Sequence, residues 1–267
     1  LSYVRRIRVG NVIKTIEGIV LKATDYQEKS KIIQVFSREH GLMSIYLRGA
    51  NEYRHKTYSL AQVLTHASFS IYYKEHGLST GYSGEILNGF MNLKLNFDKN
   101  VFIFHLFELI LKTIEKHEPF PTLFDLLLEI MLLVDRTDDP LTQHLLTLAF
   151  EFKLLYYLGL APVIDRCVEC GQAKHISTFD PSLGGFICRN CLSDHTNIRF
   201  YSLDTLQAII QLYTKSLDVV IEENITPRMI QELRWIIDEY YRFHLGVTTH
   251  SRTYLPPIGE TKNHLTS

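Results

Sequence analysis

The cysteines are the residues whose type and spacing most clearly predict chemistry. All four lie between positions 167 and 191, in two Cys-x-x-Cys pairs separated by seventeen residues. The first pair is Cys167 with Cys170 and the second is Cys188 with Cys191. A Cys-x-x-Cys pair forms a tight turn that brings two thiolates within reach of one metal ion. Two such turns complete a tetrahedral site with four sulfur ligands.

Zinc is the metal that this pattern favours, with iron in a rubredoxin-like site or an iron–sulfur cluster as alternatives. Without a metal, the pairs would be buried free thiols or a redox pair, although no thioredoxin-like pattern surrounds them. His175 and His195 lie in the same segment and are expected at the surface, since four thiolates already fill the coordination sphere. With no open position for water or substrate, we expect the zinc to be structural.

Composition indicates an ordinary folded protein. The 267 residues are 46% hydrophobic and 21% charged, enough for one large domain or two smaller ones. The longest apolar run, Leu123–Val134, contains Asp125 and Glu129 and is too short to cross a bilayer. No export signal is recognisable, so we expect a cytoplasmic protein with reduced cysteines. No His-Glu-x-x-His, Gly-x-Ser-x-Gly or phosphate-loop motif occurs, and we expect no enzymatic activity.

The net charge of −1 conceals an uneven distribution. Residues 1–85 contain twelve Lys and Arg against seven Asp and Glu, whereas residues 86–267 contain sixteen against twenty-two. A basic first part favours an anionic partner such as nucleic acid, although an excess of this size also arises by chance.

Residues 15–88 have the pattern of a small all-β domain. Tight turns join five stretches rich in β-branched, aromatic and other apolar residues, and no helical pattern lies between these stretches. Such a chain predicts a five-stranded barrel, for which the OB-fold, a common oligonucleotide binder, is the candidate. The number of strands alone does not exclude an SH3-like barrel. The strands are predicted at residues 15–23, 31–38, 42–48, 63–74 and 78–87.

From about residue 96 the apolar period becomes helical. Thr122 is the expected N-cap of an almost entirely apolar helix, Leu123–Asp135, which should therefore be central. Further helices are predicted at residues 142–158, after Ser202, and after Thr226 up to Gly246. The fold class is therefore predicted to be α+β: an N-terminal OB-fold barrel, then an α-helical domain that contains a four-cysteine zinc finger.

The predicted domain limits follow from these changes of pattern. They are 1–88 for the OB-fold domain with a short basic N-terminal extension, 89–163 for the first part of the helical domain, 164–195 for the zinc finger, 196–250 for the second helical part and 251–267 for a flexible tail.

Binding of single-stranded DNA requires cations for the phosphates and aromatic rings for the bases. The predicted barrel offers both, with tyrosines at 26, 46, 53, 58, 72 and 73, and the loop at residues 49–56 is the most suggestive stretch. Each residue taken singly is also explained as a solvated lysine or a half-buried aromatic. The candidate DNA-binding residues are Lys22, Lys29, Lys31, Arg38, Arg48, Tyr53, Arg54, Lys56 and Lys74.

Several segments, in this order, resemble the RecO family over about residues 14–255. The two cysteine pairs match the zinc-bearing members of that family. The other matching segments are Glu17–Leu21, Asp25–Glu28, Lys31–Gly41, Arg48–Ala50, Phe150–Leu155, Leu158–Pro162, Tyr241–Gly246 and Ser251-Arg252.

This resemblance implies a protein of DNA repair and homologous recombination. Such a protein binds single-stranded DNA, anneals complementary strands and helps to load recombinase onto DNA covered by single-strand-binding protein. The implied partners are RecR and the C-terminal tail of single-strand-binding protein, held by the helical domain, with RecF as a further candidate and no membrane. The protein would be cytoplasmic and associated with the nucleoid during repair.

The chain departs from the family after Gly49-Ala50, where members often carry a denser basic cluster. Here Asn51, Glu52 and Tyr53 precede Arg54, so weak intrinsic affinity for DNA is expected. The alternative function is a protein-interaction adaptor in the same repair pathway with little autonomous DNA binding. Because phosphate contacts release counterions, a salt-dependent affinity for single strands would separate the two.

Overall fold

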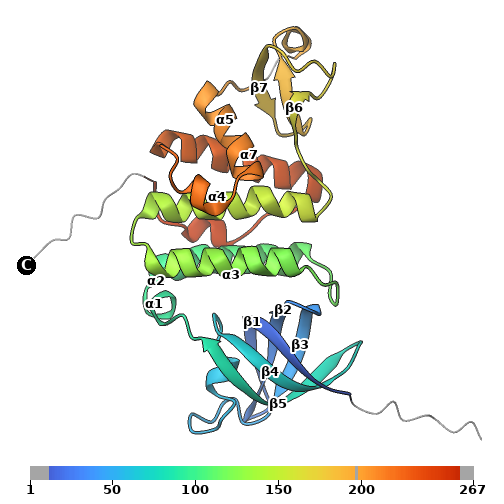
Figure 1. Ribbon diagram of the computed structural model, residues 1–267, viewed down its shortest axis with the longest axis vertical. Helices are drawn as coiled ribbons and strands as arrows, with labels where there is room; N and C mark the ends of the chain where they lie inside the picture. The colour runs from blue at the N-terminus through green and yellow to red at the C-terminus, as the bar shows by residue number, and fades with distance from the viewer. Residues whose placement is uncertain (1–11, 196–197, 259–267) are drawn as a thin grey trace, which may run out of the picture. The chain divides into compact units, whose positions relative to one another are not determined.

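A computed structural model describes residues 12–195 and 198–258 (Figure 1). The predicted basic extension, residues 1–11, and the last part of the predicted tail, residues 259–267, lie outside the described residues. The chain forms two compact units. The first comprises the residues up to Lys94 together with Ile114–Asp125, and the second comprises Leu95–Thr113 and the residues from Leu126 onward.

The first unit is a closed barrel of five strands, in the order β1-β2-β3-β5-β4. Antiparallel pairing of β1 with β4 closes it, and the parallel pairing of β3 with β5 interrupts a simple meander. This arrangement confirms the predicted α+β class with an OB-like barrel. The strands are β1 (Val12–Tyr26), β2 (Ser30–Ser37), β3 (Gly41–Leu47), β4 (His66–Tyr73) and β5 (Leu78–Asn88).

Alternation of side chains builds the barrel core. Every second residue of a strand points inward, and β-branched and aromatic side chains fill these positions. Ile33 and Val35 on β2, Ile45 on β3, and Phe69 and Ile71 on β4 are fully buried in one cluster.

The segment Ile114–Asp125, which follows helix α2 (Phe97–Thr113), also belongs to the first unit and lies against the barrel. His117 donates its backbone N–H to the Leu42 carbonyl over 3.0 Å. Gly41 has a φ of +61°, and a Cβ there would lie 1.9 Å from the Glu118 carbonyl oxygen. Only glycine combines this backbone conformation with so close an approach.

Helices follow the barrel: α1 (Met91–Leu95), α2 (Phe97–Thr113), α3 (Pro121–Arg136), α4 (Pro140–Tyr157), α5 (Leu203–Thr214), α6 (Leu217–Val220) and α7 (Pro227–Leu245). Short 3-10 turns are η1 (Ser59–Ala61), η2 (Cys191–Asp194) and η3 (Ser251–Tyr254). Within the described ranges, none of the helices has the length and apolar character needed to cross a membrane.

The predictions of helix ends that rest on a capping residue next to the helix are confirmed for α5 and α7. Ser202 accepts from the Thr205 N–H at the start of α5, and Thr226 accepts from the Met229 N–H at the start of α7. Gly246 ends α7 with a φ of +63°. Thr122 is not an N-cap, because α3 already begins at Pro121, a favoured first helical residue.

The central helix of the second unit is α4, and the prediction that assigned this place to α3 is wrong. The segment from Gln143 to Leu155 is buried almost continuously, and α2, α5, α6 and α7 pack against it. By contrast, Leu126, Leu128 and Leu132 of α3 are only half-buried.

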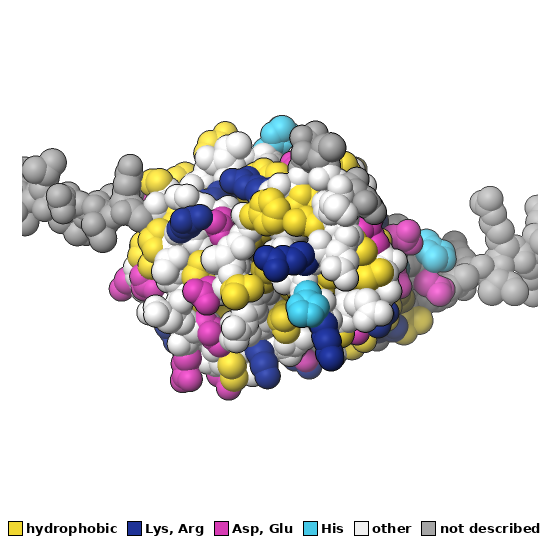
Figure 2. Space-filling view, turned by 90° about the horizontal axis from the view of Figure 1, so that it is seen from above, with side chains coloured by type: hydrophobic (Ala, Val, Ile, Leu, Met, Phe, Trp, Pro, Cys, Tyr) yellow, Lys and Arg dark blue, Asp and Glu magenta, His cyan; other side chains and the backbone are white. Residues whose placement is uncertain are grey.

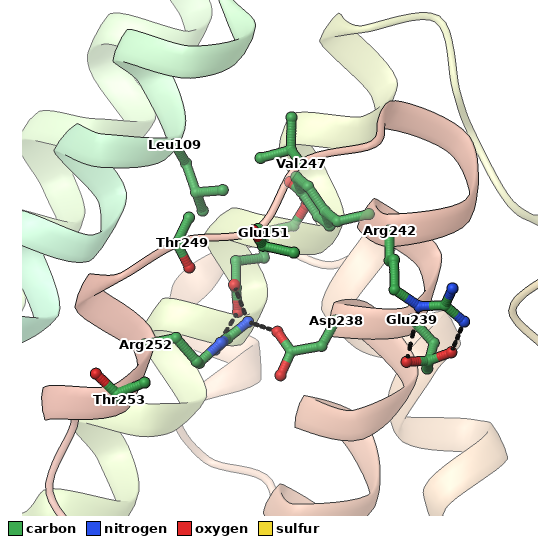
Figure 3. A pocket seen from close by; sticks show the side chains of 11 residues that line it. Leu109, Glu151, Asp238, Glu239, Arg242, Val247, Thr249, Arg252 and Thr253 are labelled. Atoms are coloured by element: carbon green, nitrogen blue, oxygen red, sulfur yellow. Dashed lines mark hydrogen bonds and ion pairs between the residues drawn. The ribbon is translucent and has the colours of Figure 1, made fainter.

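The prediction of a flexible tail from residue 251 is wrong for its first residues. Arg252 donates to Glu151 of α4 and lies 2.6 Å from an Asp238 carboxylate oxygen of α7 (Figure 3). Glu108 of α2 accepts from the backbone N–H of Ser251, and the Pro256 carbonyl accepts from His144. This segment is therefore a packed part of the helical unit, beside a pocket lined by Leu109, Val247 and Thr249 among others.

Candidate metal centre and nucleic-acid interface

A small three-stranded sheet of the second unit carries the cysteines. Its strands are β6 (Val163–Cys167), β7 (Ile176–Asp180) and β8 (Gly185–Cys188), in the order β6-β8-β7. Cys167 ends β6 and Cys188 ends β8, and these two strands are neighbours. Cys170 lies in the turn after β6, closed by the N–H of Gly171 on the Cys167 carbonyl, and Cys191 begins η2.

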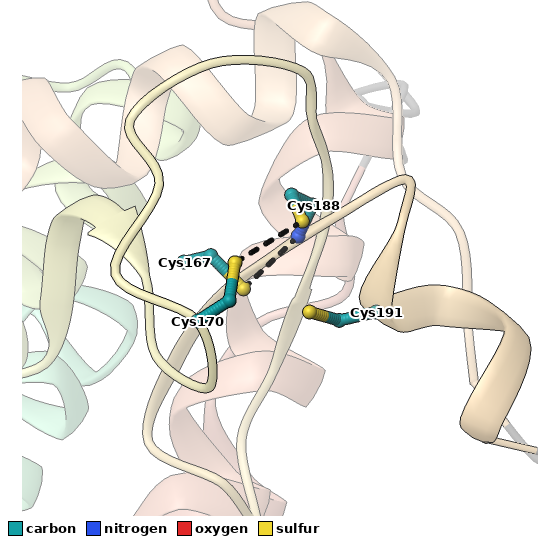
Figure 4. A group of neighbouring side chains, drawn as sticks. All are labelled: Cys167, Cys170, Cys188 and Cys191. Atoms are coloured by element: carbon teal, nitrogen blue, oxygen red, sulfur yellow. Dashed lines mark hydrogen bonds between the residues drawn. The ribbon is translucent and has the colours of Figure 1, made fainter.

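The four sulfur atoms meet at one point (Figure 4). Their Sγ atoms all lie within 4.8 Å of one another, and those of Cys170 and Cys188 are 3.6 Å apart. A tetrahedral zinc site with Zn–S bonds of about 2.3 Å places its sulfurs roughly 3.8 Å apart, so this spacing fits zinc. A disulfide needs about 2.05 Å, and all four cysteines are free.

The electrostatics of the sulfurs also favour a cation. Burial raises the pKa of the Cys167 thiol, but backbone N–H groups of Cys170, Cys188 and Glu169 outweigh it and lower that pKa to about 6. The neighbouring sulfur of Cys170 raises the pKa of Cys191. Four thiolates so close together repel one another unless a positive ion lies between them. The residues present therefore fit a metal ion with four sulfur ligands.

The two histidines of this segment are not part of the sulfur cluster. The His195 Nε2 atom lies 2.8 Å from an oxygen of Glu169, and its ring is half-buried. His175 is exposed and has a φ of +59° in the turn before β7.

We call the part of the chain that contains β6, β7, β8 and η2 the cysteine module. Aromatic packing attaches this module to α7. The rings of Phe179 and Tyr240 lie 6.3 Å apart, and His244 donates to the Pro181 carbonyl over 2.8 Å. Figure 2 views the molecule from the end at which β6 and β7 lie in Figure 1, and shows hydrophobic and basic side chains next to one another on that face.

On the barrel, the predicted DNA-binding residues separate into groups. Consecutive hairpins of a barrel turn at alternate ends, so the β1–β2 turn and the β3–β4 loop lie at one end of it. Five of the predicted residues lie at this end, which we call the loop end: Lys29, Arg48, Tyr53, Arg54 and Lys56.

The β3–β4 loop is held by its own hydrogen bonds. The Thr57 hydroxyl donates to the Arg48 carbonyl over 2.7 Å, and Glu52 donates its N–H to the Gly49 carbonyl. Gly49 has a φ of +75°, and the ring of His55 occupies the space that a Cβ there would need. The loop therefore presents its charged side chains from a defined backbone.

The cations of this loop are free for a ligand. Arg48, Arg54 and Lys56 are exposed, and none of them forms an ion pair with another described residue. Tyr53 is 82% exposed, with its ring 5.3 Å from that of Tyr58. Lys29 pairs with Glu52 over 2.8 Å.

The remaining predicted residues lie elsewhere. Arg38 follows β2 at the opposite end of the barrel, where it pairs with Glu17 and Asp125 and lies over the Phe124 ring. Lys74 lies in the β4–β5 turn at that end. Lys22 is exposed on β1, and Lys31 of β2 pairs with Asp25.

A row of outward-facing side chains crosses the barrel wall. Strand register places Tyr46 of β3 beside Thr80 of β5, and Thr80 beside Tyr72 of β4. Tyr82 packs against Tyr72 with ring centroids 5.0 Å apart. Tyr82, which lies at a register shift between β4 and β5, is not among the aromatic residues predicted from the sequence. Its place in the fifth predicted strand was the available signal.

Two family models match this chain. The model described as "Recombination protein O N terminal" matches residues 12–90, which include the barrel. The model described as "Recombination protein O C terminal" matches residues 95–253, which include the cysteine module and most of the helices. The chain belongs to the RecO family.

Curated RecO relatives cover nearly the whole chain. A protein named DNA repair protein RecO from Listeria monocytogenes serotype 4b (strain CLIP80459) is 28% identical over 250 residues, which are 93% of this chain and 96% of the relative. One from Bacillus pumilus (strain SAFR-032) is 29% identical over 250 residues, or 92% and 94%. One from Halalkalibacterium halodurans is 27% identical over 242 residues, or 91% and 94%. Membership of the RecO family makes the chain a DNA repair protein.

Proposed function

We propose that this RecO-family protein binds single-stranded DNA along the barrel, anneals complementary strands and helps to load recombinase onto DNA covered by single-strand-binding protein. One observation carries the DNA-binding part. Three unpaired cations, Arg48, Arg54 and Lys56, lie at the end of the barrel wall that bears the tyrosine row. Cations for phosphates beside aromatic rings for bases are the elements of a single-strand site.

The row also favours single strands over duplex. Tyr46, Tyr72 and Tyr82 present rings from a continuous sheet, and a ring can stack on a base only when the base is free of its own neighbours. A strand whose phosphates contact Arg48 would reach Tyr46 first, because these residues lie two positions apart at the end of β3.

The metal of the cysteine module is proposed to be zinc in a structural role. Cys167, Cys170, Cys188 and Cys191 would hold it, and four sulfur ligands leave no position for a reacting group. No catalytic activity is proposed for the protein. Bound zinc would hold β6, β8 and η2 together.

The proposed partners are RecR, the C-terminal tail of single-strand-binding protein and RecF. Membership of the RecO family supports them. The tail would bind the helical unit. The protein would act in the cytoplasm, at the nucleoid during repair.

The second candidate function is an adaptor in the same pathway that binds proteins rather than DNA. The acidic excess of residues 86–267 and the ion pair that occupies Lys29 favour it. It differs from the first in needing no affinity for isolated single strands.

Fluorescence anisotropy of a labelled oligothymidine, titrated at low and moderate salt, separates the two candidates. The first predicts binding that weakens steeply with salt, and a triple Arg48→Ala, Arg54→Ala, Lys56→Ala variant whose logarithmic salt slope is smaller by about 2, since each phosphate contact contributes roughly 0.7. A matched control replaces Lys174, Lys215 and Arg228, exposed cations of the second unit, and should bind as the wild type does. Absence of binding at low salt would favour the adaptor.

A further inference from the structure

Three histidines converge at the barrel end opposite the loop end. His40 lies in the β2–β3 turn, His76 in the β4–β5 turn and His117 in the segment between α2 and α3. The rings of His76 and His117 lie 6.2 Å apart, and the His40 ring lies 4.7 Å from that of Tyr73. All of these residues belong to the first unit, so its fold alone brings them together.

Lysines accompany the histidines. Lys14 of β1 places its Nζ 3.9 Å from the centre of the Tyr73 ring and donates to His40 Nε2 over 3.4 Å. Lys74 and Lys116 are exposed beside His76 and His117.

Acidic residues on the same segments make the local charge depend on the histidines. The acidic groups are Glu39, Glu75, Glu115 and Glu118, all of them exposed. Arg38 pairs with both Glu17 and Asp125, and this group carries a net charge of −1. Together with three lysines and four glutamates it gives a local charge of −2 while the imidazoles are neutral, and +1 when all three are protonated. Protonation therefore changes the surface from one that repels an anion to one that attracts it.

These imidazoles also lack the oxygen partner that others in the protein have. His66, His105 and His195 each contact a carboxylate, and His144 and His244 each donate to a carbonyl. No such oxygen partner is recorded for His40, His76 or His117 among the described residues, and the Nδ1 atom of His117 is buried without any hydrogen bond. Burial lowers the pKa of both His40 and His117. The charge of Lys14 lowers the pKa of His40 further, and those of His76 and then Lys116 lower the pKa of His117. A bound anion would raise the pKa of these imidazoles, so that they take up a proton on binding.

We propose that His40, His76 and His117, with Lys14 and Lys116, form a phosphate-binding surface for the backbone of a nucleic-acid strand, and that binding there is coupled to proton uptake. This rests on the proposed function, because the strand is the one that crosses the tyrosine row. Continuity supports the occupant: β4 carries Tyr72 of the row, and the turn that follows β4 carries Lys74 and His76. A strand that leaves the row at Tyr72 meets this surface next.

The test compares the pH dependence of oligothymidine binding between the wild type and a triple variant, His40→Gln, His76→Gln, His117→Asn. Asparagine is chosen at position 117 because the φ there is +66°, which asparagine tolerates. The control is His250→Gln in the second unit, an exposed residue whose side chain forms no hydrogen bond with another residue that the structure describes. Between pH 8 and pH 6 the affinity of the wild type should rise about fivefold more than that of the triple variant, because one proton whose pKa rises by a unit on binding contributes at most about tenfold and this pH range covers only part of its titration.

Wild-type binding at pH 8 tests the proposed function, whereas the difference in pH dependence tests the histidine surface. Equal pH dependence of triple variant and wild type would overturn the inference while leaving DNA binding intact.

A second measurement separates the sources of phosphate. The histidine proton resonances are titrated with pH in the presence of inorganic phosphate and, separately, of oligothymidine. A rise in the midpoints of the three histidines with the oligonucleotide supports the inference. A rise with inorganic phosphate alone, or with neither, overturns the assignment to a nucleic-acid backbone, and does so even if the wild type binds no DNA in the anisotropy assay.

Discussion

Arg252 donates hydrogen bonds to both carboxylate oxygens of Glu151, a residue 101 positions earlier in the chain. The Glu151 side chain is 1% exposed and also accepts from His105, while Arg252 additionally pairs with Asp238 (Figure 3). The buried carboxylate thus depends on a segment that follows the last long helix. A buried charged group has lost its contacts with water, so it is stable only while its ion-pair and hydrogen-bond partners are present.

Replacing Arg252 with Met should therefore destabilise the helical unit by about 3–5 kcal/mol, the usual cost of leaving one member of a buried pair unpaired. Urea denaturation followed by Trp235 fluorescence measures this, because Trp235 is the only tryptophan and lies in α7. The control is Arg242→Met, whose partner is Glu239 at the surface and whose loss should cost about 0–1 kcal/mol. Equal losses in the two variants would contradict this account of Arg252.

His144 should make the stability of the same unit depend on pH. Burial lowers the pKa of His144 to about 4, and the positive charge of Arg234 adds to the effect. Its ordinary value is 6.5, so below that pH the unfolded chain binds a proton that the folded chain rejects. The contribution of His144 to the free energy of unfolding is fully present above pH 6.5. It falls as the pH drops towards 4, and the loss is about 2 kcal/mol at pH 5.

The measurement is the free energy of unfolding at pH 7.5 and pH 5, for the wild type and for His144→Gln. Glutamine keeps a donor for the Pro256 carbonyl but has no proton to gain. The variant should lose about 2 kcal/mol less than the wild type between the two pH values. Other titrating groups, such as His105, contribute equally to both proteins and cancel. An identical loss would show that His144 does not titrate as its burial requires.

Removal of the proposed metal should unfold the cysteine module and leave the helices folded. The module is a three-stranded sheet whose four cysteines are the proposed ligands, whereas α4 and α7 pack on each other through buried apolar side chains. Structural zinc contributes on the order of 10–16 kcal/mol in isolated fingers, far more than so small a sheet gains from its own burial. After chelation, hydrogen exchange should accelerate over residues 164–195 and stay slow in α4 and α7.

Two variants sharpen this prediction. Cys170→Ala should lose the metal, and His195→Ala should keep one zinc ion per chain, because His195 contacts Glu169 rather than the sulfurs. Metal analysis measures both, and a visible absorption band would instead indicate iron. Accelerated exchange throughout α4 and α7 after chelation would contradict the separation of module and helices.

The parts of the fold that were predictable are those specified by neighbouring residues. Alternation of side chains predicted the barrel strands, Ser202 and Thr226 predicted two helix starts, and the spacing of the cysteines predicted their cluster. Thr122 misled because Pro121 competes with it one residue earlier. In each case the relevant energies are local, a capping bond or a side-chain face, and can be read along the chain.

The parts that were not predictable depend on distant partners. Gln143, His144 and Glu151 make α4 look more exposed than α3, yet all three are buried by bonds to other segments. Likewise, no composition rule distinguishes Arg38 from Arg54 as a DNA ligand. Arg38 is occupied by Asp125, 87 residues away, and only the folded chain reveals that pairing.

The tyrosine row gives the most direct test of the path of the strand. Tyr72→Ala and Tyr82→Ala should each weaken oligothymidine binding about fivefold or more, since stacking of one base on an aromatic ring contributes roughly 1–3 kcal/mol. Both rings are more than a third exposed, at 37% and 36%, so their removal should leave the barrel folded. Tyr254→Ala, at 66% exposure in the helical unit, is the control and should bind as the wild type does. If both tyrosine variants bind normally while the triple loop variant does not, the strand leaves the loop end in another direction, and the wall formed by β3, β5 and β4 is not its path.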